Sequence, residues 1–259
     1  MLNIIRSILR QIRKDKLLWF FGVYLLLMVV ITFVGEEIDW NVSGSDFSCN
    51  VAMFLQFGLP LTVGFLTTRA CGADLRDKTA NYEVLFGKKR WEVYLGRFIP
   101  SLLVSLALTA VIAAVPVLFF TVKNGWGGSL PAKQALQIFG VLFTLTFRMV
   151  CFYTAFTFLC GNDVVALIAA LVGAVVLLIA SALMKEVGYE LTWHTALTDL
   201  TRLLDFTNTT SGFFNGKDIT VYKLDLPASL LGRMVCTSFG IGFAWLLGGY
   251  AVFRKRDIP

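Results

Sequence analysis

Six long apolar runs constrain the fold of this chain more than any other feature of its sequence. Only 15% of the residues are charged, against about a quarter in soluble domains, and few of them fall in these runs. About 20 consecutive apolar residues span the hydrocarbon layer as an α-helix, because a backbone in lipid must satisfy its own hydrogen bonds. We therefore predict an all-α integral membrane protein with six transmembrane helices, near residues 17–34, 51–68, 98–122, 135–160, 164–183 and 230–253.

The first 16 residues predict an amphipathic helix that precedes the first span. Apolar side chains recur at the spacing of one helix face: Ile5, Ile8, Leu9 and Ile12. Three arginines lie on another face: Arg6, Arg10 and Arg13. A helix of this kind lies in the headgroup layer and directs its cations toward anionic lipid. Residues 1–16 are therefore expected to form an interfacial helix on the bilayer.

The distribution of lysine and arginine predicts the orientation of the spans. Fifteen of the 23 basic residues fall in one set of segments: 1–16, 69–97, 161–163 and 254–259. Six fall in the other set: 35–50, 123–134 and 184–229. Because cytoplasmic segments carry the excess of basic residues, both termini are expected in the cytoplasm of a multi-pass protein of a bacterial cell membrane. The net charge of +6 follows from this bias and gives no reason to expect a nucleic-acid partner.

The loop 184–229 is expected on the extracellular side, before the last span. It contains apolar residues at helical spacing: Trp193, Leu197, Leu200 and Leu204. They predict an amphipathic helix that caps the bundle, with a substrate gate as the alternative role. The single histidine, His194, has no cluster of Cys or carboxylate ligands at metal spacing, so no metal site is expected. No linker or repeat divides the chain, and residues 1–259 are expected to form one transmembrane domain.

The cytoplasmic segment 73–91 is the part of the sequence best suited to contact another protein. Residues 81–86 predict a short helix with apolar side chains at 82, 85 and 86, and Gly87 interrupts it before a basic restart. A short structured loop between long spans could dock a partner protein. The alternative is an interfacial anchor, in which Trp91 and Tyr94 belong to the aromatic belt of the membrane.

The order of these parts resembles the permease subunits of ABC-type-2 exporters. The loop between spans two and three is similar to the family's pattern of an acidic residue, a Lys-Thr turn, a Glu–Leu stretch and a basic cluster. In this sequence the pattern reads Asp77-Lys78-Thr79-Ala80, Glu83-Val84-Leu85 and Lys88-Lys89-Arg90. The resemblance implies that residues 73–91 form the coupling-helix region that contacts an ATPase, and that residues 1–16 form the elbow helix. It assigns the coupling role to Tyr82, Glu83, Leu85, Phe86, Lys88 and Arg90.

The sequence contains no phosphate-binding loop of its own. The nearest string, Gly212 to Asp218, has three residues between its glycines where the motif has four, and Asp218 replaces the Ser or Thr that binds Mg²⁺. No Ser–His–Asp set or HExxH motif occurs either, so we expect no catalytic residue, no enzyme activity and no cofactor in this chain. The resemblance implies that ATP and Mg²⁺ are bound by a separate ABC ATPase dimer. It also implies a second permease subunit, which is the same or a related chain.

Arg148 lies deep in the fourth predicted span, where a charged side chain costs about 2.5–3.5 kcal/mol on insertion scales. It either lines a translocation path, with Gln56 of the second span as a further candidate, or is paired structurally with a carbonyl, Gln56 or another subunit. The scarcity of charge in the spans favours an amphipathic or hydrophobic cargo. We expect peptides first, antimicrobial peptides included, and then lipids and small drugs. The alternative function is a membrane scaffold or sensor without transport, whose segment 73–91 would bind something other than an ATPase.

Overall fold

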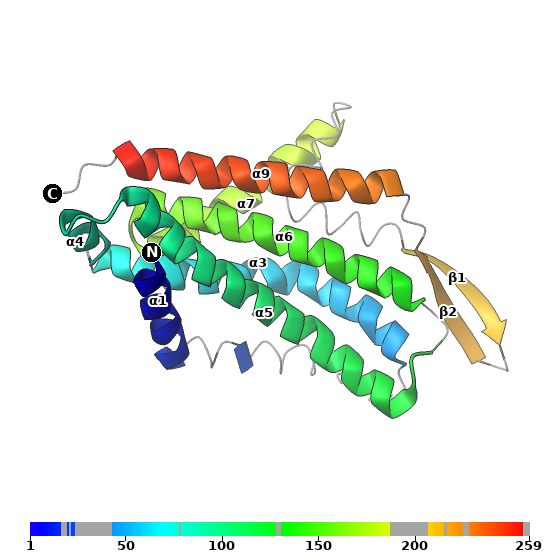
Figure 1. Ribbon diagram of the computed structural model, residues 1–259. Coiled ribbons are helices and arrows are strands. Elements are labelled where there is room, and N and C mark those ends of the chain that lie inside the picture. Colours follow the sequence, from blue (N-terminus) through cyan, green and yellow to red (C-terminus); the bar gives the residue numbers. More distant parts are fainter. Residues whose placement is uncertain are drawn as a thin grey trace.

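Seven helices and one β-hairpin make up the described part of the chain (Figure 1). The computed structural model describes residues 1–16, 20, 22–23, 43–77, 79–127, 131–186, 207–214, 217–224 and 228–255. The helices are α1 (Leu2–Lys14), α3 (Gly44–Arg76), α4 (Thr79–Leu85), α5 (Arg90–Asn124), α6 (Ala132–Cys160), α7 (Asp163–Glu186) and α9 (Ala228–Lys255). The strands are β1 (Thr207–Phe214) and β2 (Lys217–Leu224).

Three of these helices are long and apolar enough to cross a membrane: α5, α6 and the part of α9 from Leu231 to Lys255. They indicate a membrane protein and coincide with three of the predicted spans. Helices α3 and α7, with 33 and 24 residues, occupy the positions of two more and pack against α6. The first predicted span, 17–34, lies outside the described residues except for 20, 22 and 23. Six spans therefore remain a prediction.

Helix α6 lies at the centre of the described bundle and contacts α3, α5, α7 and α9. Its buried side chains, including Leu142, Leu145 and Tyr153, belong to the main apolar cluster. The contact with α9 is close because small residues face each other there. A Cβ atom on Gly249 would lie 2.8 Å from the Ala155 Cα atom and 2.6 Å from the Tyr94 hydroxyl oxygen. The two backbones can approach this closely only with glycine at position 249.

We expect Gly249→Ala to destabilise the bundle, because the added methyl group meets backbone that cannot move aside cheaply. Overpacking of this kind costs about 1–3 kcal/mol, which lowers the unfolding temperature by about 5 °C in a chain of this size. The matched control is Gly248→Ala, whose Cβ atom would have no neighbour within 4 Å. Thermal unfolding in detergent checks both variants. Equal unfolding temperatures for the two would contradict the close contact.

The two ends of the bundle differ in structure (Figure 1). Helix α1, helix α4 and the C-terminal end of α9 lie at one end, and the hairpin lies at the other. Helix α1 runs crosswise to α5, α6 and α9, as expected of a helix that lies along a membrane surface. The segments predicted to be cytoplasmic thus gather at one end of the molecule.

The hairpin lies in the loop 184–229, for which the sequence analysis predicted no strand. Its two strands pair antiparallel, from Thr207 opposite Leu224 to Phe214 opposite Lys217. The signal was present in the sequence, because Asn215-Gly216 between two runs rich in Thr, Phe, Val and Tyr is typical of a hairpin. The amphipathic helix predicted around residues 193–204 falls outside the described residues.

Candidate functional site

The short helix α4 lies at the end of the bundle that also holds α1 and the C-terminal end of α9 (Figure 1), and it presents an apolar surface there. Tyr82, Leu85 and Phe86 are 57%, 63% and 86% exposed, and these three residues are called the α4 surface below. Gly87 ends the helix at φ +86°, a conformation that favours glycine. The exposed lysines Lys88 and Lys89 follow it directly. An apolar surface bordered by cations suits a partner that has an apolar cleft with an acidic rim.

The inner side of α4 is packed rather than exposed. Ala80 is fully buried and belongs to a cluster with Ile4 and Ile8 of α1, Tyr94 of α5 and Phe253 of α9. Helix α4 itself contacts α3 and α5, and the apolar cluster continues from there to α1 and α9. Motion of α4 would be transmitted to them through this apolar cluster.

An ion network fixes α4 to the long helices α3 and α5. Arg97 of α5 is fully buried. Its Nη1 atom donates to the Glu83 carboxylate of α4 at 2.8 Å, and its Nη2 atom donates to the Asp74 carboxylate of α3 at 3.0 Å. Gln11 of α1 donates to the other oxygen of Asp74 at 3.2 Å. Because a buried cation is tolerated only when it is paired and hydrogen-bonded, Arg97 joins α3, α4 and α5 in one arrangement.

A second network lies beside the first and ties α7 to α3. Asp163, at the first turn of α7, is 4% exposed and accepts from Arg69 at 2.9 Å and from Arg76 at 3.0 Å. Arg69 also donates to Asp15, just after α1, at 3.1 Å. Hydrogen bonds to Asp15 and Asp163 raise the pKa of the Arg69 guanidinium. Gly72 permits the approach, since a Cβ atom there would lie 2.8 Å from the Asp163 Cα atom.

The turn between α6 and α7 explains why Asp163 reaches this network. Gly161 ends α6 in the left-handed conformation, at φ +69°. The Asn162 side chain then accepts from the backbone N–H groups of Val164 and Val165 and caps α7. The three-residue turn predicted from the sequence therefore delivers a carboxylate directly to α3.

Helix α9 is held at the same end by polar contacts to its backbone. Arg90 donates to the carbonyl oxygens of Phe253 at 3.0 Å and Arg254 at 2.6 Å, which satisfies carbonyls at the end of α9. The Tyr94 hydroxyl donates to the Leu246 carbonyl at 3.0 Å. At Cys71 of α3, burial raises the pKa of the thiol to about 11. The thiol therefore stays protonated, and it donates to the Arg97 carbonyl oxygen at 3.6 Å.

The residues assigned to coupling fall into two groups in the structure. Tyr82, Leu85, Phe86 and Lys88 are exposed and available to a partner. Glu83 and Arg90 make internal bonds, to Arg97 and to the end of α9. The sequence analysis missed Arg97, Asp74 and Asp163 as site residues. Charged residues at the ends of apolar runs are a signal that such a site exists. The sequence does not show which of them pair, because Arg97 and Asp74 are 23 positions apart and Asp163 and Arg69 are 94 positions apart.

The two candidates for a translocation path are Arg148 and Gln56. Arg148 is 3% exposed in α6, and α9 approaches it closely, because a Cβ atom on Gly242 would lie 3.4 Å from its Cα atom. Gln56 belongs to α3, but its side chain lies outside the described residues. A path lined by these two residues stays a prediction. Among the described residues, no group of three or more His, Cys, Asp or Glu side chains lies close enough together to hold a metal ion.

Two comparisons with known proteins found no match, so the functional argument rests on the geometry described above. No protein-family model matches the chain, and no curated protein sequence matches it.

Proposed function

We propose that this chain is the permease subunit of an ABC exporter and that the α4 surface is the docking site of the ATPase subunit. One observation carries the proposal: an exposed apolar surface stands on a seven-residue helix whose inner side is fixed by ion pairs to long apolar helices. A scaffold needs an exposed surface to bind a partner. It does not need that surface to be bonded to α5 and, through Arg97, to α3, whereas a coupling element does.

In this proposal, force from the ATPase reaches the spans through the Arg97 network. A partner seated on Leu85 and Phe86 moves α4, and the bond from Glu83 to Arg97 moves α5 with it. The bond from Arg97 to Asp74 carries the same displacement to α3. The bonds are short and the Arg97 side chain at their centre is fully buried, so the coupled elements move together rather than independently.

The proposal places the α4 end of the bundle in the cytoplasm and the hairpin end outside. The excess of Lys and Arg at the α4 end supports this orientation. ATP and Mg²⁺ bind to the partner, and a second permease subunit completes the path across the bilayer. The scarcity of charge along the described apolar helices supports an amphipathic or hydrophobic cargo, with peptides, antimicrobial peptides among them, as the first class to test.

Purification from the native host tests the proposal against a membrane scaffold. The chain should co-purify with a subunit that carries a phosphate-binding loop, and the complex should hydrolyse ATP faster when a cargo peptide is added. Recovery of a stable complex that contains no ATP-binding subunit would support the scaffold and contradict the exporter.

A further inference from the structure

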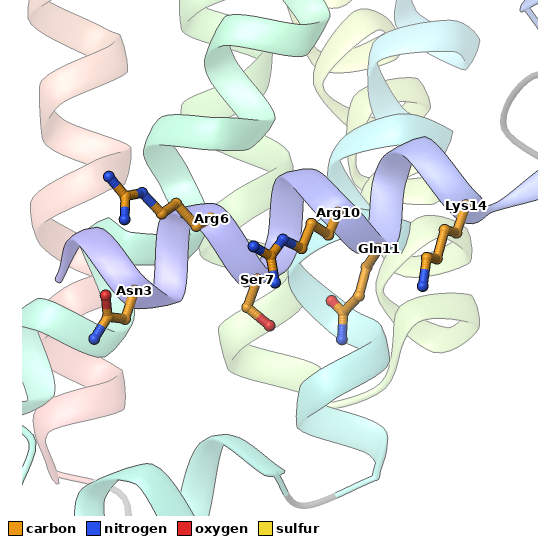
Figure 2. Close-up of a pocket in the computed structure, with 6 residues that line it drawn as sticks. All are labelled: Asn3, Arg6, Ser7, Arg10, Gln11 and Lys14. Carbon is orange, nitrogen blue, oxygen red and sulfur yellow. The ribbon is translucent and has the colours of Figure 1, made fainter.

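A basic groove runs along the polar side of α1 (Figure 2). Its volume is about 390 Å³, and six residues of α1 line it: Asn3, Arg6, Ser7, Arg10, Gln11 and Lys14. Three of them are cations, and the other three carry neutral side chains that can donate hydrogen bonds. No acidic residue is among them. Two carboxylates near this helix are already paired: Asp15 bonds to Arg69, and Asp74 bonds to Arg97 and accepts from Gln11.

The groove lies at the level where the apolar part of the bundle begins. Ile4 of α1 packs on Gly96 of α5, where a Cβ atom would lie 2.9 Å from an Ile4 methyl carbon. Position 96 lies two residues before the apolar run predicted for residues 98–122. Helix α1 therefore crosses the bundle at the boundary between hydrocarbon and water, which is the depth of lipid headgroups.

The side chains on the other faces of α1 also fit a position at the depth of the lipid headgroups. Ile4 and Ile8 are buried against the bundle. Leu2 and Leu9 are 69% and 37% exposed and lie on a side of the helix away from the groove. A helix that packs sideways against a bundle, with an apolar strip on one side and cations on the other, is suited to the membrane interface. Its strip faces acyl chains, and its cations face phosphate groups.

We propose that the α1 groove binds the headgroup of an anionic phospholipid. Two guanidinium groups and an ammonium group provide the charge for a phosphate, and guanidinium groups match its oxygens in bidentate geometry. Asn3 and Ser7 donate to the remaining headgroup oxygens. The groove also borders the Arg97 network, because Gln11 lines it and donates to Asp74. The site requires only that α1 lies on a bilayer, so it stands whether or not the partner of α4 is an ATPase.

Native mass spectrometry of the purified full chain tests the site. The chain is released from nanodiscs that contain equal amounts of phosphatidylglycerol and phosphatidylcholine, and the bound lipids are counted. Phosphatidylglycerol should be retained in preference to phosphatidylcholine. Arg6→Gln together with Arg10→Gln should reduce its retention about tenfold or more, because both guanidinium groups that attract the headgroup phosphate are lost. Arg6→Lys with Arg10→Lys keeps both charges and should retain most of the binding.

The matched control removes the same charge from another helix at the same end of the bundle. Arg254 and Lys255 are exposed in the last turn of α9 and do not line the groove, so Arg254→Gln with Lys255→Gln should leave phosphatidylglycerol retention within about twofold of the wild type. If both double glutamine variants lost phosphatidylglycerol equally, the binding would be due to the overall surface charge, and the site would be overturned. Equal retention of the two lipids by the wild type would overturn it as well. Displacement of phosphatidylglycerol by millimolar glycerol 3-phosphate would assign the groove to a free phosphate compound instead of a lipid.

Discussion

Arg97→Met is expected to lower the unfolding temperature of the chain by about 10 °C. The Arg97 side chain is fully buried and donates to Glu83, to Asp74 and to the Val93 carbonyl. Methionine fills a similar volume but leaves two carboxylates facing each other without their shared cation. Removing one partner of a buried ion pair costs about 3–5 kcal/mol, and in a chain of this size each kcal/mol shifts the unfolding temperature by about 2–4 °C.

Thermal unfolding monitored by fluorescence-detected size exclusion measures this effect. Arg254→Met is the control, because the Arg254 side chain is exposed at the end of α9 and only its carbonyl accepts a bond from Arg90. The triple variant Arg97→Met, Asp74→Asn, Glu83→Gln removes every charge of the set and should recover part of the loss, because no unpaired carboxylate remains. An unfolding temperature for Arg97→Met equal to that of Arg254→Met would show that the network does not hold these helices together.

The double variant Leu85→Ala, Phe86→Ala is expected to weaken binding of the ATPase subunit by about 30-fold or more. Large apolar side chains at the centre of an interface contribute about 1 kcal/mol or more each, which together corresponds to about 30-fold; here the two side chains are 63% and 86% exposed. Because neither side chain is buried in the chain itself, its unfolding temperature should not change. Loss of binding with unchanged stability is the signature of a docking surface.

Affinity for the ATPase subunit, measured with both components purified, checks this prediction. The control is Val122→Ala with Leu136→Ala, which removes two comparably exposed apolar side chains, 87% and 72% exposed. They lie at the ends of α5 and α6 nearest the hairpin (Figure 1). The control should bind the ATPase with wild-type affinity. Binding that survives loss of Leu85 and Phe86, or that depends equally on Val122 and Leu136, would remove the docking role from α4.

The apolar runs predicted where helices lie, but not where they end. The second predicted span ends at residue 68, whereas α3 continues to Arg76. The third begins at residue 98, whereas α5 starts at Arg90. Hydropathy ends a span at the first charges, because an unpaired charge is costly in lipid. In the folded chain, Arg97 and Asp74 pair with each other and the helices continue through them.

Helical spacing in residues 81–86 identified a helix with an apolar side, and the structure contains it. Spacing alone could not separate the side chains that face outward from those that bond inward. Glu83 and Phe86 are three residues apart, yet Glu83 bonds to Arg97 while Phe86 is exposed. That distinction depends on where α5 lies, which a local pattern does not contain. The hairpin is a different case, because Asn215-Gly216 is a local turn signal that the sequence contains, and it predicts a hairpin without any knowledge of the other helices.

Site-specific photocrosslinking in intact cells tests whether α4 docks an ATPase. A photoreactive phenylalanine analogue replaces Phe86 in one version of the chain and Leu136 in another. We expect position 86 to crosslink to a cytoplasmic subunit whose sequence contains a phosphate-binding loop, and position 136 not to do so. A crosslink from position 86 to lipid alone, or to a protein without an ATP-binding site, would contradict this expectation.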